Sequence, residues 1–112
     1  MTGVRLNRAL VLEAPERLAD GMGGHALTWA AVGQVWAEVL PGSGREVGGE
    51  EMLLASVPYR VTLRAAPVGA PQRPVPGQRF RDGTRIFDIL AVTERDPDGR
   101  YLRCFVREEV QK

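Results

Sequence analysis

A strict two-residue alternation runs through the segment Tyr59–Arg64. The apolar residues fall on one side of an extended chain and the polar ones on the other: Tyr59, Val61 and Leu63 against Arg60, Thr62 and Arg64. This pattern predicts a β-strand with one face in a core and the other in solvent. The segment Arg100–Arg107 repeats the alternation, with Leu102, Cys104 and Val106 on its apolar side. The chain is therefore expected to fold around a sheet.

Turn signals at short spacing divide the last third of the chain into a meander. Asp82-Gly83 favours a hairpin because that turn requires a positive φ, and Asp96–Gly99 combines proline and glycine in a second turn. The strands expected around these turns are Gln78–Arg81, Thr84–Glu94 and Arg100–Arg107.

Two further strands are expected in the first third. Val4–Glu13 alternates loosely and should end at Pro15, because proline cannot donate to a β-ladder. A glycine-rich loop follows, and a short apolar run at Leu27–Trp29 comes next. Val32–Leu40 is rich in β-branched and aromatic residues, which favour a strand.

Two segments lack a strand pattern. Residues 41–56 are predicted to be a flexible loop, with a short helix where Glu50–Ala55 combines helix-forming residues with leading acids. Residues 66–77 are predicted to be a semi-rigid connector because of their prolines, which are Pro67, Pro71, Pro74 and Pro76.

The whole chain, residues 1–112, is expected to form a single domain. Its fold class is mainly β: a small β-barrel or sandwich of about five or six strands, with long loops and at most one short helix. The inward-facing strand positions predict a core that comprises Val35, Tyr59, Val61, Leu63, Ile89, Val92, Leu102 and Val106.

Composition restricts the function. The formal net charge is +1, from 15 basic and 14 acidic residues, whereas a protein that binds nucleic acid through phosphates needs a clear basic excess. The single cysteine permits neither an internal disulfide nor a cysteine-rich zinc site. The N-terminus lacks a signal-peptide pattern, and no apolar stretch approaches the length of a membrane helix. We expect a soluble protein made in the cytoplasm.

The residues that carry chemistry are few and isolated. His25, the one histidine, lies in the glycine-rich loop without a partner, and Cys104 is expected to be a small buried apolar residue. Ser43 and Ser56 lack the strand–turn–helix context of a nucleophile, and Asp96–Gly99 lacks the spacing and the closing glutamate of a calcium loop. We therefore expect no enzyme activity, no bound metal and no cofactor.

Several short motifs follow one another in order along the chain. A first strand ending at Pro15 is followed by Asp20-Gly21, Trp29 and the strand end Trp36-Ala37-Glu38-Val39. After a variable glycine- and glutamate-rich loop come Tyr59–Arg64, Gly83, Phe87-Asp88-Ile89, Val92, Asp98-Gly99 and Tyr101–Val106. In this order and spacing the chain resembles the phage head–tail joining family, also called head-closure or stopper proteins, over almost its whole length. It departs from the family where Phe87 replaces the commoner tyrosine and where the Pro67–Pro76 stretch is longer.

The resemblance implies a structural role in a virion. Subunits of this family form a ring below the portal and its adaptor, and the tail docks beneath that ring, which retains packaged DNA until delivery. The implied partners are other copies of the chain, the adaptor or portal ring above, the tail terminator or tail tube below, and the DNA in the channel. The implied location is the neck of a phage or of a gene transfer agent particle. We expect a hexameric ring, with a dodecamer as the alternative.

Two groups of residues are candidates for these contacts. The loop expected to gate the channel, because its glycines keep it mobile and its charges act on DNA, comprises Gly42, Arg45, Glu46, Gly48, Gly49, Glu50 and Glu51. Contacts with neighbouring subunits or rings are expected from arginines, whose planar fork grips carboxylates: Arg73, Arg79, Arg81, Arg103 and Arg107.

Two other functions stay open at this point. The first is a neighbouring neck ring; adaptors of this kind are mainly helical and tail terminators are α/β, whereas the sequence has few helix signals. The second is a small nucleic-acid-binding barrel, which the near-neutral charge disfavours. Phe80 between Arg79 and Arg81 is the nearest approach to a base-stacking platform, but core packing is expected for the aromatic residues instead.

Overall fold

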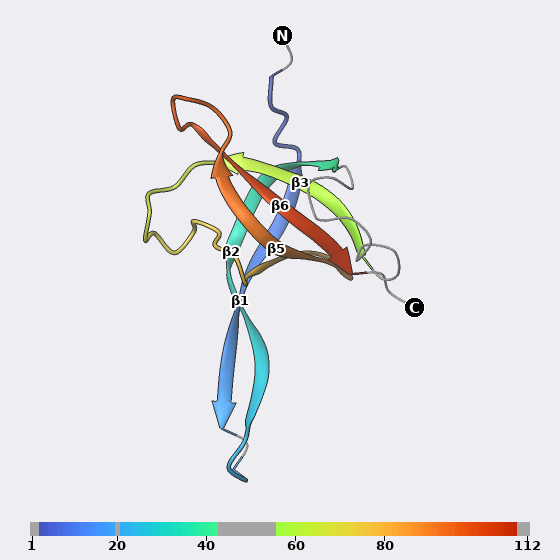
Figure 1. Ribbon diagram of the computed structural model, residues 1–112, viewed down its shortest axis with the longest axis vertical. Helices are drawn as coiled ribbons and strands as arrows, with labels where there is room; N and C mark the ends of the chain where they lie inside the picture. The colour runs from blue at the N-terminus through green and yellow to red at the C-terminus, as the bar shows by residue number, and fades with distance from the viewer. Residues whose placement is uncertain (1–2, 20, 43–55, 110–112) are drawn as a thin grey trace.

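The computed structural model describes residues 3–19, 21–42 and 56–109. Six strands follow one another along the chain: β1 (Arg8–Ala19), β2 (His25–Pro41), β3 (Ser56–Arg64), β4 (Arg79–Asp82), β5 (Arg85–Glu94) and β6 (Tyr101–Glu109). They close into an antiparallel barrel in the order β1-β2-β3-β6-β5-β4, which confirms the mainly β fold class (Figure 1). Strands are the only regular elements in these ranges, and the short helix expected at Glu50–Ala55 lies outside them.

The barrel closes because β4 pairs with both β1 and β5. Leu12 lies opposite Phe80, and Phe80 lies opposite Phe87, so one layer of large apolar side chains crosses three strands. All three side chains are fully buried. Closure removes the open strand edges from the barrel.

The alternation in β3 and β6 sets the core as expected. The register places Leu63 opposite Leu102 and Tyr59 opposite Val106, so the apolar sides of the two strands meet inside the barrel. The buried apolar residues are Leu10, Leu12, Ala37, Val61, Leu63, Phe80, Phe87, Ile89, Leu102, Cys104 and Val106. Val35, Tyr59 and Val92, which were also predicted to be in the core, are partly buried and pack against its rim.

The first two strands differ from the expectation. β1 begins at Arg8 rather than Val4 and continues through Pro15 to Ala19, and β2 runs unbroken from His25. A register shift between Leu12 and Glu13 marks the point where β1 leaves the barrel. Beyond Glu13, the last residue of β1 that pairs with β4, β1 pairs with β2 alone, so Pro15 lies where one edge of the strand is open.

The distal halves of these strands form a two-stranded arm, which we define as residues Ala14–Ala19 and His25–Ala30. Ala14 pairs with Ala30 at its base, and Ala19 pairs with His25 near its tip. Figure 1 shows the arm, in blue and cyan, extending well away from the barrel. The molecule is accordingly elongated, with extents of 56 × 34 × 23 Å.

The connector between β3 and β4 contains no strand. It is nevertheless held to itself and to the barrel: Arg73 Nη1 donates a hydrogen bond to the carbonyl of Ala66 at 2.9 Å, and Pro74 is buried. The two expected turns are also present. Gly83 and Gly99 adopt φ values of 61° and 66°, which glycine tolerates without strain.

Candidate assembly surfaces

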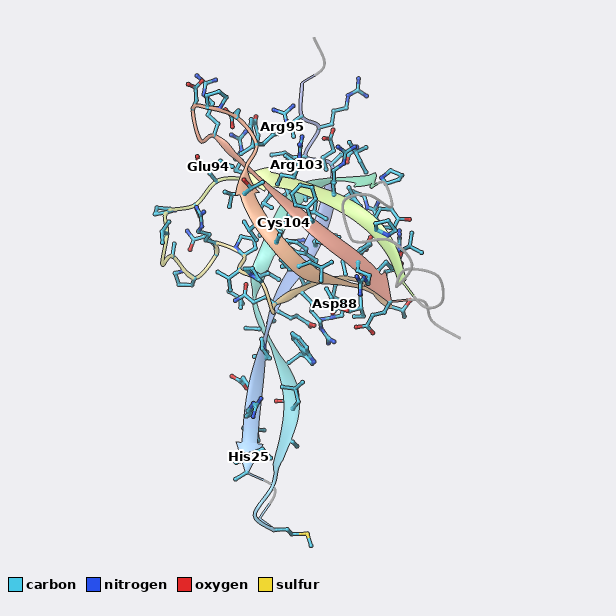
Figure 2. All side chains as sticks on the ribbon, viewed as in Figure 1. His25, Asp88, Glu94, Arg95, Arg103 and Cys104 are labelled. Atoms are coloured by element: carbon cyan, nitrogen blue, oxygen red, sulfur yellow. The ribbon has the colours of Figure 1, made fainter. Side chains whose placement is uncertain are left out.

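The residues with catalytic potential are far apart. His25 lies on the arm and Cys104 inside the barrel (Figure 2). Burial raises the pKa of the Cys104 thiol to about 12, slightly opposed by the charge of Arg73, so the thiol is protonated at neutral pH. Among the described residues, no group of three metal-ligating side chains comes together. In the same ranges, no helix has the length and apolarity needed to cross a membrane.

A buried ion-pair cluster ties β1 to β4. Glu13, only 5% exposed, accepts hydrogen bonds from Arg79 Nε at 2.7 Å and from Arg81 Nε at 2.8 Å. Burial alone would raise the pKa of Glu13, but the hydrogen bonds from Arg81 and Arg79 and their charges outweigh burial and hold it below its usual value. The structure thus places both arginines in an internal cluster, while their expected contacts with neighbouring subunits stay a prediction.

The arm is attached to this cluster at its base. The guanidinium carbon of Arg79 lies 4.1 Å from the centroid of the Trp29 ring on β2. Arg79 therefore contacts the arm through Trp29 and the barrel through Glu13. This cation–π contact adds a side-chain link between the base of the arm and the barrel.

The arm carries exposed apolar side chains toward its tip. Leu18 and Leu27 are each more than half exposed, and Met22, in the turn that joins the strands, is 90% exposed. Figure 2 shows no part of the barrel beside this end of the arm. Leu18 pairs with Ala26 and Leu27 pairs with Arg17, so the two leucines lie on opposite faces of the ribbon. A two-stranded ribbon is only marginally stable on its own, and exposed apolar side chains on both of its faces suit contacts with other chains.

Trp36 is a second exposed apolar residue, and it corrects the expectation that the aromatic residues pack in the core. Its side chain is 56% exposed because it lies on the outer face of β2 beside the fully buried Ala37. It lines a hollow of about 360 Å³ together with Leu6, Val35, Leu63 and Pro67. Phe80 and Phe87, in contrast, are fully buried as expected.

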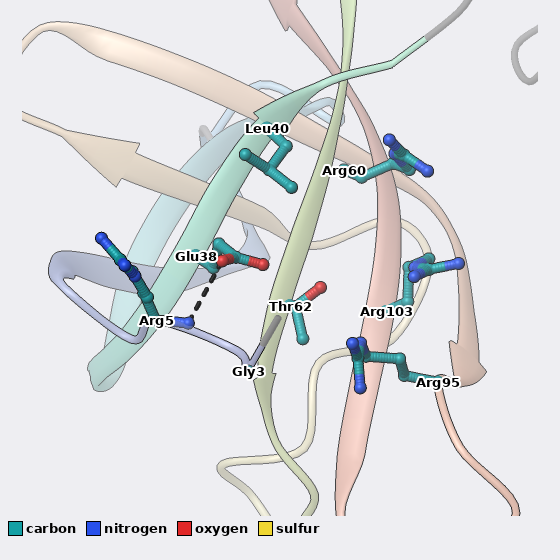
Figure 3. A pocket seen from close by; sticks show the side chains of 8 residues that line it. All are labelled: Gly3, Arg5, Glu38, Leu40, Arg60, Thr62, Arg95 and Arg103. Carbon is teal, nitrogen blue, oxygen red and sulfur yellow. Dashed lines mark hydrogen bonds between the residues drawn. The ribbon is translucent and has the colours of Figure 1, made fainter. Parts of the chain in front are cut away.

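The outer faces of β2, β3 and β6 form a pocket of about 500 Å³ rich in arginine. It is lined by Gly3, Arg5, Glu38, Leu40, Arg60, Thr62, Arg95 and Arg103, and we call it the arginine pocket. Figure 3 shows Arg60, Arg103 and Arg95 along one side and Arg5 with Glu38 on the other. Glu38 Oε2 accepts a hydrogen bond from the backbone N–H of Arg5 at 3.1 Å.

A pair of carboxyl groups lies near the end of β6. Burial raises the pKa of Asp88 to about 6, helped by a hydrogen bond with Glu109 and by its negative charge; Arg79 and Arg107 partly oppose the shift. On this surface Arg107 lies directly opposite Asp88 in the β5–β6 register. Arg107 is therefore engaged within the subunit.

The structure thus places the predicted site residues in different parts of the molecule. Arg79 and Arg81 form the internal cluster, Arg73 holds the connector, and Arg103 lies in the arginine pocket. Of the predicted gating loop, only Gly42 lies within the described residues. Sequence reasoning missed the arm and the arginine pocket. The exposed tip had one signal, the apolar residues Met22 and Leu27 on either side of Gly23-Gly24.

Comparison with known proteins gives a consistent result. A family model described as phage head completion protein matches residues 1–109. A chain in the virion of a native gene transfer agent particle is 65% identical, with a TM-score of 0.78 over 95% of this chain and 96% of that chain. A solution structure of a protein from Shigella flexneri 2a has the same fold, with a TM-score of 0.71 at 21% identity over 100% of both chains. A comparison with curated proteins finds no significant match.

Proposed function

The chain belongs to the family of phage head completion proteins, a structural component of the virion neck between head and tail, and from this premise we propose that it is the stopper subunit. Copies of it form a ring between the portal or adaptor and the tail. The ring retains packaged DNA and offers the surface on which the tail docks. The likeness to a chain of a gene transfer agent virion favours a particle of that kind or a phage.

The observation that carries this proposal is the arm. The barrel closes its own sheet, and all of its buried core residues lie outside the arm. The exposed Leu18, Met22 and Leu27 instead suit a contact with another subunit. An arm that reaches from one copy to a different surface of the next makes a head-to-tail contact, which is the kind that closes into rings.

The segment proposed to gate the channel connects β2 and β3, whose neighbouring ends are joined by a hydrogen bond. Gly42 donates its backbone N–H to the carbonyl of Pro58 at 3.0 Å, which holds the end of β2 against the start of β3. Residues 43–55, which contain most of the proposed gating loop, lie outside the described residues. Their assignment as the gate therefore rests on sequence: a glycine-rich, acidic segment suits a passage for DNA because its carboxylates repel phosphates.

The two alternatives receive less support. A mainly helical adaptor or an α/β tail terminator is disfavoured by the exclusively stranded character of the described residues. A nucleic-acid-binding barrel is disfavoured by the net charge of +1 and by Phe80, which is fully buried and offers no stacking surface between Arg79 and Arg81.

Electron cryomicroscopy of intact particles tests the proposal. We expect a ring of this chain between portal and tail, hexameric by preference, with the tip of each arm against a neighbouring subunit. Leu27→Glu, which places a charge on the apolar end of the arm, should abolish ring density in the neck. The matched control Arg17→Gln, at the position paired with Leu27, should preserve it. Absence of the chain from the neck would overturn the proposed function. Intact rings with Leu27→Glu would overturn the role of the arm in assembly.

A further inference from the structure

We propose that the arginine pocket binds a carboxylate-bearing segment of a neighbouring protein in the neck. The identity of that neighbour rests on the proposed function, whereas the chemistry of the pocket does not. The ligand is an acidic peptide segment that also carries apolar side chains.

The charge of the pocket calls for an anion. Four arginines line it, Arg5, Arg60, Arg95 and Arg103, against one carboxylate, Glu38. Other arginines of the barrel show that a guanidinium group binds carboxylates directly: Arg8 lies 2.6 Å from Asp82, and Arg85 lies 2.7 Å from Glu108. Like charges gathered in a concave site raise the affinity for an opposite charge.

Arg103 supplies the sharpest evidence. Its Nε is buried and has no hydrogen-bond acceptor among the described residues. It projects from β6 directly opposite Thr62, which is 4% exposed and forms the floor of the pocket. A buried donor without an acceptor is unfavourable. A carboxylate that binds the Arg103 guanidinium would relieve this cost when the side chain turns Nε toward it and forms a charge-assisted hydrogen bond.

The pocket also explains why the ligand should be protein rather than DNA. Leu40 lines it and is 44% exposed, next to the arginines (Figure 3). A nucleic-acid backbone offers phosphates but no apolar side chain to cover Leu40. Duplex DNA also needs an extended basic surface rather than a confined hollow that contains Glu38. A peptide with alternating acidic and apolar residues satisfies both parts of the site.

Binding by the free, full-length subunit provides the test. The probe is a short synthetic peptide of alternating glutamate and leucine, compared by titration calorimetry with the same peptide carrying glutamine for glutamate and with a short DNA duplex. We expect the glutamate peptide to bind most tightly. Arg103→Gln and the exposed variant Arg95→Gln should each weaken it about tenfold, as expected for a charge-assisted contact. Arg17→Gln on the arm removes the same charge away from the pocket and should leave affinity unchanged.

Three results would overturn the proposal. They are equal binding of the glutamate and glutamine peptides, binding that none of the pocket variants weakens, and tighter binding of the duplex through the same arginines. Thermal melting of each variant identifies loss of the fold, and Arg95→Gln remains informative if Arg103→Gln unfolds. If the peptide binds but particles contain no ring of this chain in the neck, the proposed function is rejected and the peptide-binding role of the pocket stands. If particles contain the ring but the subunit does not bind the peptide, the role of the pocket is rejected and the proposed function stands.

Discussion

The guanidinium of Arg79 lies over the indole ring of Trp29, 4.1 Å from its centroid. The same guanidinium donates from Nε to the buried Glu13 at 2.7 Å. One side chain thus joins a closed barrel to a projecting arm. Substitutions of Glu13 and of Trp29 test the two contacts of Arg79 separately.

Removing the acid of this cluster should destabilise the barrel. Glu13→Gln keeps the shape of the side chain but removes the buried carboxylate that Arg79 and Arg81 share, and Arg79 is itself largely buried. We therefore expect a loss of about 3 kcal/mol in the free energy of unfolding. Chemical denaturation measures it. The matched control is Asp82→Asn, which breaks the partly exposed pair with Arg8 and keeps a favourable turn residue before Gly83; its cost should stay below about 1 kcal/mol. Equal costs would contradict the special role of Glu13.

The contribution of Glu13 to the free energy of unfolding should decrease as the pH becomes acidic. The pKa of Glu13 is lower in the folded state than its ordinary value of 4.5, so the folded state holds its proton less tightly than the unfolded chain. The stability that Glu13 adds is therefore fully present above about pH 4.5 and is lost as the pH falls through the lower folded value. The difference between wild type and Glu13→Gln should shrink on acidification.

Removing the aromatic partner should loosen the arm and spare the core. Trp29→Ala deletes the surface on which Arg79 stacks, a contact worth about 1 kcal/mol. Hydrogen exchange should become faster in Ala14–Ala19 and His25–Ala30, with β3 and β6 unchanged. Trp36→Ala, an exposed tryptophan on the same strand, is the control and should leave exchange in the arm as it was. Faster exchange throughout the barrel with Trp29→Ala would mean that Trp29 supports the core rather than the arm.

The sequence predicted the barrel because its core strands obey local rules. The alternation in Tyr59–Arg64 and in Arg100–Arg107 identified the buried faces, and the turns at Gly83 and Gly99 fixed where strands reverse. Each of these signals lies within a few residues of the structure that it specifies. The fold class followed from their number and spacing.

The arm and the arginine pocket could not be predicted in the same way. A proline such as Pro15 normally ends a strand, and only the pairing partners show that β1 has one open edge at this residue. The pocket gathers Arg5, Arg60, Arg95 and Arg103 from four separate segments. Their proximity depends on the register between β3 and β6, which places Arg103 opposite Thr62 and which no local pattern reveals.

The carboxyl pair of Asp88 on β5 and Glu109 on β6 should lower the stability of the fold as the pH rises, which is the opposite of the effect expected for Glu13. The folded state raises the pKa of Asp88 from 3.8 to about 6, so it binds the proton more tightly than the unfolded chain, and ionisation costs stability as the pH rises through that range. Asp88→Asn should therefore stabilise the protein at pH 7 by at most about 1 kcal/mol, since solvent screens this partly exposed group. The gain should vanish below about pH 4 in denaturation experiments. Asp98→Asn on the exposed turn is the control, and a gain that persists in acid would contradict this origin.

Replacing Arg45–Glu51 by a glycine–serine linker should separate folding from function. The hydrogen bond between Gly42 and Pro58 closes the base of this insertion, so the barrel should keep its melting temperature in the free subunit. Particles that carry the linker should leak DNA after packaging or fail to attach tails, measured by nuclease-sensitive DNA and by infectivity or transfer. The comparison variant replaces Val68–Ala70, a stretch of the other long connector in which Val68 and Gly69 are exposed, with a linker of the same kind. Collapse of the fold with the first linker, or damage to particles with the second alone, would show that Arg45–Glu51 is ordinary structure and would move the gate to the connector.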